Sequence, residues 1–308
     1  MPTPLAYLNG QLIPASQAAL RVYDAGFVLG VTVAEQVRTF AGRLFRLQQH
    51  LTRLSHSVDI IGIDPGVSMS KLEKAAVELA EQNHALLDEG DDLGLSIFIT
   101  PGPYSTMAAV AGGAGEAGPT VCMHTYPLPF HLYADKYEHG QSLVVSDVQQ
   151  VPAACWPPEL KCRSRMHYYL ADAQARRVRP DARALLLDCD GHVLEASTAN
   201  IVIYNLGEGI VSPPKEKILP GVSVGMVAEL AAESGIPFLH RDLSVDDVLQ
   251  ADEVMLCSTS PCVWPVVDVD GRPIADGKPG AMTTKLLAAW SDAVGVDIKT
   301  QAKRFSTR

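Results

Sequence analysis

The pattern of apolar and polar positions predicts a hairpin at the start of the chain. Residues 5–8 and 11–13 form two short runs around Asn9-Gly10, which is the favoured pair for a two-residue hairpin turn. Further along, residues 95–100 and 120–125 are apolar runs typical of buried strands. The first part of the chain is therefore expected to contain strands that are largely buried.

Helical spacing appears between these runs. One apolar stripe predicts a helix, and its members are Leu47, Leu51, Leu54, Val58 and Ile61. A second helix, to about Asn83, is predicted from Ser70-Lys71-Leu72-Glu73, which has the Ser-x-x-Glu form of a capping box. Because strands and helices mix over residues 1–125, we expect a smaller N-terminal α/β domain there.

A proline-containing segment, residues 126–132, is the expected interdomain linker. The chain has 308 residues, above the ~250–300 at which single cores tend to split, so two domains are expected. Residues 133–308 should form a larger C-terminal domain with a mixed sheet, which gives an α/β (α+β) fold class. Its expected strands are 142–145, 184–187, 193 onward, 201–204, 253–256 and 263–267, and its expected helices are 164–176, one after Gly221, and 282–294.

Composition and charge exclude several classes of protein. Hydrophobic residues make up 47% and charged residues 19%, which supports a large core rather than disorder. The formal charge of −10 disfavours nonspecific binding to nucleic acid or to anionic membranes. No apolar stretch of about 18 residues predicts a membrane helix, and residues 1–5 lack the features of a signal peptide. We therefore expect a cytoplasmic protein with reduced cysteines.

The candidate chemistry involves few residue types. The six cysteines include no Cys-x-x-Cys and the nine histidines no metal-spaced cluster, so no metal site is expected. Lys161 is followed, 34 positions later, by Glu195, an acid that interrupts an apolar strand before Ser197-Thr198. Taken alone, Lys161 is expected to be a solvated surface lysine, and Glu195 could be a strand-edge acid that faces water.

Six motifs in order change that expectation. Together they resemble the class IV, fold-type IV aminotransferases, a family that includes branched-chain aminotransferases, D-amino acid aminotransferases and aminodeoxychorismate lyases. Each motif alone is weak, but six in register over most of the chain are specific. They are residues 24–30 leading to Glu35, residues 44–54, Lys161, the Glu195 segment, residues 218–223, and residues 257–260 followed by Pro265-Val266 and an Asp270-Gly271 turn.

The resemblance implies a pyridoxal 5'-phosphate cofactor held by Lys161 as a Schiff base, with Lys161 also moving a proton. Glu195 would pair with the pyridine nitrogen, which makes the ring an electron sink. The cofactor phosphate would be held by Arg53, Val222, Ser223 and Thr259.

Elementary chemistry is consistent with these phosphate contacts. The fork of an arginine matches phosphate oxygens, and the N-terminus of a helix opened by Gly221 favours an anion. Arg53 lies off the apolar stripe of its helix, so it is either solvated or directed at a ligand. The resemblance also implies a homodimer.

The usual anchors for a substrate carboxylate are missing from their usual places. Branched-chain members carry Tyr-x-Arg on the strand after the second helix, whereas residues 95–99 contain neither residue type. D-amino acid enzymes have an arginine just after that strand, where this chain has Thr100-Pro101-Gly102. The remaining candidates for contact with substrate are Arg38, Tyr104, Arg163 and Ser260.

Three functions stay open. The first is a transaminase that moves an amino group between an amino acid, branched-chain-like or otherwise apolar, and a 2-oxo acid. A variant of this function uses a D-amino acid or a simple amine as the amino donor. The second is an aminodeoxychorismate lyase that releases pyruvate, since residues 161–165 resemble the Lys-x-x-Asn-Arg of that branch. The third is a non-catalytic member, against which the retention of Lys161, Glu195 and Arg53 argues.

Overall fold

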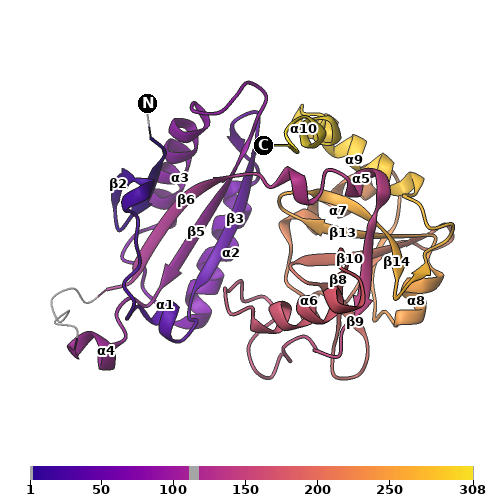
Figure 1. The fold of residues 1–308 in the computed structure, drawn as a ribbon, viewed down its shortest axis with the longest axis horizontal. Coiled ribbons are helices and arrows are strands. Elements are labelled where there is room, and N and C mark those ends of the chain that lie inside the picture. The colour runs from indigo at the N-terminus through magenta and orange to yellow at the C-terminus, as the bar shows by residue number, and fades with distance from the viewer. Residues whose placement is uncertain (1–2, 111–117, 308) are drawn as a thin grey trace. The chain divides into compact units, whose positions relative to one another are not determined.

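The computed structural model describes residues 3–110 and 118–307, and the chain divides into two compact units. Unit 1 comprises the described part of Met1–Leu128 together with Leu160–Ser164, and unit 2 comprises the described part of Pro129–Glu159 and Arg165–Arg308 (Figure 1). The first division, after Leu128, lies within the expected linker 126–132. The return of Leu160–Ser164 to unit 1 has no counterpart in the domain boundaries drawn from the sequence.

Unit 1 is built on a six-stranded antiparallel sheet with the order β2-β1-β6-β5-β3-β4. The expected hairpin is confirmed: Leu8 pairs with Gln11, and Asn9 and Gly10 both have the positive φ that such a turn requires. The strands are β1 (Leu5–Leu8), β2 (Gln11–Pro14), β3 (Val33–Phe40), β4 (Arg43–Leu44), β5 (Leu93–Thr100) and β6 (Thr120–Pro127).

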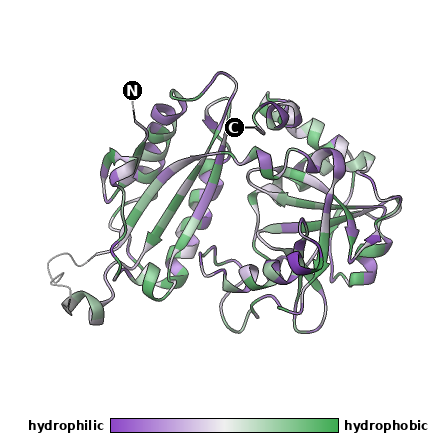
Figure 2. Cartoon of the chain, viewed as in Figure 1, coloured by the Kyte–Doolittle hydropathy of each residue, from purple (hydrophilic) through white to green (hydrophobic). Residues whose placement is uncertain are grey.

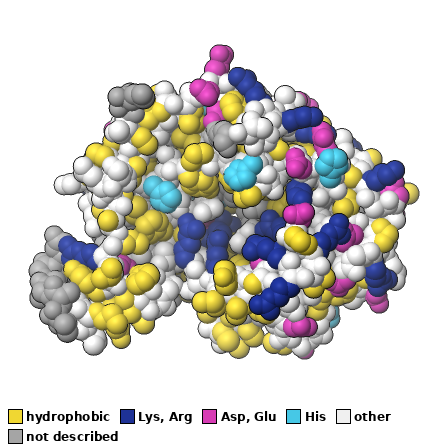
Figure 3. Space-filling view, in the orientation of Figure 1, with side chains coloured by type: hydrophobic (Ala, Val, Ile, Leu, Met, Phe, Trp, Pro, Cys, Tyr) yellow, Lys and Arg dark blue, Asp and Glu magenta, His cyan; other side chains and the backbone are white. Residues whose placement is uncertain are grey.

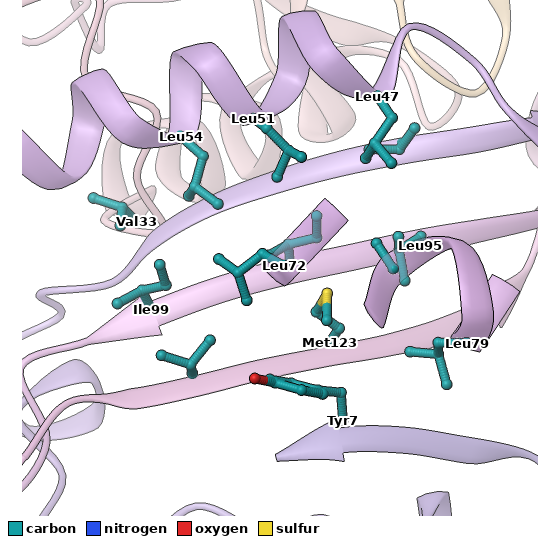
Figure 4. Packing of buried hydrophobic residues seen from close by; sticks show 14 of the residues in the cluster. Tyr7, Val33, Leu47, Leu51, Leu54, Leu72, Leu79, Leu95, Ile99 and Met123 are labelled. Carbon is teal, nitrogen blue, oxygen red and sulfur yellow. The ribbon is translucent and has the colours of Figure 1, made fainter. Parts of the chain in front are cut away.

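Two long helices bury their apolar faces against one side of this sheet. The predicted stripe of α2 (Leu47–Ile61) is confirmed, since Leu47, Leu51 and Leu54 point toward the strands in Figure 4 and are buried. Burial of each such leucine contributes about 1.5–3 kcal/mol. The other helices of unit 1 are the 3₁₀ turn η1 (Ala15–Gln17), α1 (Ala25–Val28), α3 (Met69–His84) and α4 (Ser105–Val110).

The start of α3 differs from the expectation. The predicted capping box at Ser70 and Glu73 is wrong, because the N-cap is Ser68, whose side chain accepts a hydrogen bond from the Lys71 amide at 3.3 Å. Met69, the first helical residue, packs against the core of unit 1. The choice between two nearby serines is therefore made by tertiary packing.

Unit 2 contains a nine-stranded mixed sheet with the order β12-β11-β10-β13-β14-β7-β8-β9 and β15 beside β14. Because β9 also pairs with β10, the strands from β10 to β9 form a closed ring. The strands are β7 (Gln141–Val145), β8 (Arg183–Leu187), β9 (Val193–Ala196), β10 (Ala199–Asn205), β11 (Gly209–Ser212), β12 (Phe238–His240), β13 (Glu253–Ser258), β14 (Cys262–Val269) and β15 (Arg272–Pro273).

Helices accompany this sheet, among them α6, which packs on β8, and α7, which packs on β13. The helices of unit 2 are η2 (Phe130–Leu132), α5 (Lys136–His139), α6 (Met166–Val178), η3 (Lys215–Lys217), α7 (Val222–Glu233), α8 (Val245–Gln250), α9 (Ala281–Val294) and α10 (Ile298–Arg304). The mixed strands and helices confirm the expected fold class.

Hydropathy follows this architecture. The strands of both units are mostly hydrophobic in Figure 2, as expected for sheets that carry the cores. On the face of unit 2 seen in Figure 3, acidic and basic side chains are interspersed, so the net negative charge is not gathered in one patch there. Among the described residues, no helix combines the length and the apolar character needed to cross a membrane.

Candidate functional site

Lys161 lies in a backbone segment that is pinned to the sheet of unit 1. The amide of Ala34 donates to the Lys161 carbonyl at 2.9 Å, and the amide of Arg163 donates to the Thr32 carbonyl at 2.8 Å. The amide of Lys161 itself donates to Ser57 Oγ of α2 at 3.2 Å. Three hydrogen bonds thus fix the backbone around this lysine.

A buried ionic cluster connects β3 with α2. Arg53 donates from Nε to Glu35 Oε1 and from Nη2 to Glu35 Oε2, both at 2.7 Å, and His50 Nδ1 lies 2.7 Å from Glu35 Oε2. Alternation along β3 puts Glu35 on the face of Val33 and Val37 that packs on the helices. Arg53 is only 9% exposed, so the solvated alternative for this residue is wrong.

Electrostatics fix the protonation of this cluster. Burial alone would raise the pKa of Glu35, but the charge and hydrogen bonds of Arg53, with help from His50, lower it to about 2. Burial lowers the pKa of His50, and the positive charges of Arg53 and Lys161 lower it further against the opposing effect of Glu35. At neutral pH, Glu35 is therefore ionised and His50 is neutral, with its Nδ1 proton donated to the carboxylate.

Glu195 is buried in unit 2. It is 3% exposed and lies in β9, which is paired on both sides, so the water-facing strand edge is wrong. The Tyr168 hydroxyl and Gln150 Nε2 both donate to Glu195 Oε1. Burial and the charge of Glu195 raise the pKa of Tyr168 well above its usual value, so this phenol keeps its proton and remains a donor.

These partners were not found from the sequence. Glu35 and His50 stood within two of the quoted motifs without a role, and the spacing of His50 and Arg53, one helical turn apart, was the available signal. For Tyr168, the one available sequence feature was its position on the helix expected after Lys161. No sequence feature pointed to Gln150 as a partner of Glu195. Each acid is thus held by donors that lie elsewhere in the chain.

A close backbone approach shapes the N-terminus of α7. Its N-cap is Gly221, and a Cβ there would lie 2.0 Å from Asn200 Oδ1, so the backbone approaches closely only because the residue is glycine. Asn200 Nδ2 in turn donates to the Leu219 carbonyl at 3.0 Å. Val222 and the buried Ser223 open the helix. Thr259 follows β13, the strand on which α7 packs.

The four candidate substrate residues lie in different settings. Arg38 is buried, with its guanidinium 3.9 Å from the centre of the Phe40 ring. Tyr104 precedes α4, and Ser260 lies in the turn between β13 and β14. Arg163 is two residues from Lys161 and donates to Ser96 Oγ at 2.7 Å. Of the four candidates, Arg163 is therefore the one nearest to Lys161 in sequence.

Within the described residues, three potential metal ligands also gather at a hairpin turn. They are Asp188, Asp190 and His192. Asp188 accepts the amides of the other two and an ion pair from Lys217 at 3.3 Å. These contacts stabilise the turn and explain why the three side chains lie close together.

The comparison with known protein families decides the assignment. A family model described as amino-transferase class IV matches residues 32–269. The chain belongs to this family. Within this aminotransferase family, the chain is similar to the D-alanine aminotransferase of Bacillus licheniformis, with 28% identity over 93% of this chain and 95% of the relative.

Two solved branched-chain amino acid aminotransferases share its fold. The one from Escherichia coli has a TM-score of 0.84 at 23% identity and is covered, like this chain, over 94% of its length. The one from T.th., solved with pyridoxamine 5'-phosphate, has a TM-score of 0.83 at 23% identity over 96% of this chain and 95% of that one. The expected fold-type IV architecture is thereby confirmed.

Proposed function

We propose that this aminotransferase moves an amino group from an apolar amino acid to a 2-oxo acid, with pyridoxal 5'-phosphate as cofactor and Lys161 as catalytic residue. The observation that carries the proposal is the fixed backbone of Lys161 together with the Glu35–His50–Arg53 cluster, on which the charge of Lys161 acts. The effect of Lys161 on the pKa of the buried His50 indicates that its charge lies near this cluster.

The residues present fit the cofactor that class IV aminotransferases use. Glu195 is a buried carboxylate that accepts hydrogen bonds from two donors. Such a carboxylate suits the protonated ring nitrogen of the cofactor, which needs a nearby anion. The glycine-capped N-terminus of α7 suits a phosphate, because its free amides and helix dipole favour an anion. Val222, Ser223, Thr259 and Arg53 would hold that phosphate.

When bound, pyridoxal phosphate supplies a carbonyl carbon that takes the amino group and a ring that takes up an electron pair. The amine of Lys161 would hold the cofactor and then move the proton between the substrate Cα and C4′ of the cofactor, as transfer of the amino group requires. Glu195 would hold the proton at the ring nitrogen, and Tyr168 and Gln150 would keep its carboxylate in place. Glu35 would fix the guanidinium of Arg53 through Nε and Nη2.

Transfer is favoured over elimination. The curated relative reported above is named an aminotransferase, and it acts on D-alanine by its name, so alanine and branched-chain amino acids of either hand are the first donors to test. An aminodeoxychorismate lyase would use the same lysine but release pyruvate. The donor panel below separates the two reactions.

The proposal is tested with the purified protein loaded with pyridoxal phosphate. L- and D-alanine, L- and D-leucine, and isopropylamine are each added while the visible spectrum is followed, and 2-oxoglutarate is then supplied as acceptor. We expect a subset of the amino acids to bleach the spectrum and to yield the matching oxo acid. Pyruvate release from aminodeoxychorismate without bleaching by any donor would contradict transfer.

We also propose a homodimer. Large apolar side chains are exposed on each unit, among them Phe27 of α1 at 73% and Tyr169 of α6 at 69%. Exposed aromatic residues of this kind are enriched at interfaces. Light scattering should give twice the mass of the chain, and Phe27→Glu or Tyr169→Glu should shift the protein toward the monomer. A wild-type monomer at micromolar concentration would contradict the proposal.

A further inference from the structure

A second feature of unit 1 is a pocket on the sheet face that lies opposite to the helices. Its volume is about 520 Å³, within the range of small-molecule sites. Its walls include Gln36, Ser96, Phe98, His124, Tyr126 and Arg163.

Strand register builds the floor of this pocket. Gln36 pairs with Ser96, and Ser96 pairs with His124, so these three side chains form one row across β3, β5 and β6. In the next row, a Cβ on Gly94 would lie 2.2 Å from the ring of Tyr126. The absence of a side chain at Gly94 therefore lets this ring lie across β5, where its hydroxyl lies 3.4 Å from Gln36 Oε1.

Arg163 gives the pocket its charge. Among the described residues that line it, Arg163 is the single cation and none is an acid. Its Nη2 donates to the neutral hydroxyl of Ser96 at 2.7 Å, which directs the guanidinium over the floor. Burial lowers the pKa of His124, and the charge of Arg163 lowers it further, so His124 stays neutral. The pocket thus presents a positive group to an anion.

The position of Arg163 links this pocket to the proposed chemistry. Arg163 lies two positions after Lys161 in a segment that pairs with the start of β3, a rise of roughly 7 Å in extended backbone. An α-amino acid carries its amine and its carboxylate on one carbon, so both groups must be met within such a span. Arg38, the other arginine candidate, is buried and is instead held against Phe40.

We propose that Arg163 binds the α-carboxylate of the amino donor in this pocket and thereby makes the enzyme select amino acids over amines that lack a carboxylate. This inference rests on the proposed role of Lys161. Strand β5 contributes Ser96 and Phe98 to the pocket, and neither side chain carries a charge. The positive charge comes instead from Arg163, in the segment that carries Lys161. The rings of Phe98 and Tyr126 provide apolar surface for the rest of the donor.

The test compares Arg163→Leu and Arg163→Lys with the wild type, all loaded with pyridoxal phosphate. The substrates are the alanine enantiomer that the wild type prefers and isopropylamine, which is alanine without its carboxylate. We expect Arg163→Leu to lower kcat/KM for alanine about 10- to 100-fold, mainly through KM, because a charge-assisted hydrogen bond is lost. Activity with isopropylamine should not fall, and Arg163→Lys should recover part of the loss.

The exposed Arg43 offers a matched control, since Arg43→Leu makes the same change of charge in the same unit. Equal losses of kcat/KM for alanine and for isopropylamine in Arg163→Leu would overturn the inference. A binding readout separates it from the proposed function. Propionate should bind the loaded wild type at least tenfold more tightly than Arg163→Leu in calorimetry, even if no donor is transaminated, and equal binding would overturn the inference by itself.

Discussion

The substitution Glu35→Gln isolates the charge at the centre of the unit 1 cluster. Glutamine keeps the size of the side chain but removes the negative charge that Arg53 and His50 contact. Arg53 would then be a buried cation without its carboxylate partner. We expect this change to destabilise the protein strongly at neutral pH.

The magnitude follows from the pKa of Glu35. Its lowering from the ordinary 4.5 to about 2 corresponds, at about 1.36 kcal/mol for each pKa unit, to roughly 3 kcal/mol of folding free energy. Removal of one partner of a buried ion pair typically costs about 3–5 kcal/mol, which agrees. Because the folded pKa is depressed, this stabilisation is complete above pH 4.5 and is lost as the pH falls through 2.

Urea unfolding of the wild type and the variant at pH 7, 5 and 3 measures both the size and the pH dependence. The difference between the two proteins should be roughly 3 kcal/mol at pH 7 and 5, and smaller at pH 3. Glu81→Gln, an exposed change of the same chemistry on α3, should lie within about 0.5 kcal/mol of the wild type. A Glu35→Gln variant as stable as that control would refute the reasoning.

Two further changes test the supports in unit 2. Tyr168→Phe removes a donor to the buried Glu195 and should lower kcat about tenfold with the cofactor still bound, as steady-state kinetics would reveal; an unchanged kcat would mean that Gln150 suffices. Gly221→Ala places a Cβ 2.0 Å from Asn200 Oδ1 and should weaken cofactor retention about tenfold in equilibrium dialysis, because the start of α7 must shift. Gly225→Ala, where a Cβ meets nothing within 4 Å, is the control, and equal retention in both variants would contradict the assignment.

Local patterns predicted much of unit 1 because burial and periodicity coincide there. The stripe of Leu47, Leu51 and Leu54 faces one side of a sheet, and Asn9-Gly10 has the backbone freedom that a tight turn needs. The cap of α3 was misplaced because Ser68 and Ser70 are both good N-caps. The packing of Met69 decides between them, and packing is not visible in a single sequence.

The site divides in the same way. Motifs in register predict Lys161, Glu195 and Arg53 as site residues, and these roles stay predictions. The hydrogen-bond partners of Glu195 and Arg53 depend instead on contacts between distant segments. Gln150 reaches Glu195 across 45 positions of the chain, and Arg53 reaches Glu35 across 18. Such contacts follow from strand register and helix placement, so a single sequence carries little trace of them.

The assignment of Lys161 is tested most directly by trapping its bond to the cofactor. The loaded protein is reduced with borohydride, digested and analysed by peptide mass spectrometry, with Lys161→Ala as the parallel sample. The account predicts a phosphopyridoxyl group on Lys161 in the wild type and no stoichiometric label in the variant. A label on another lysine, or the same labelling in Lys161→Ala, would contradict it.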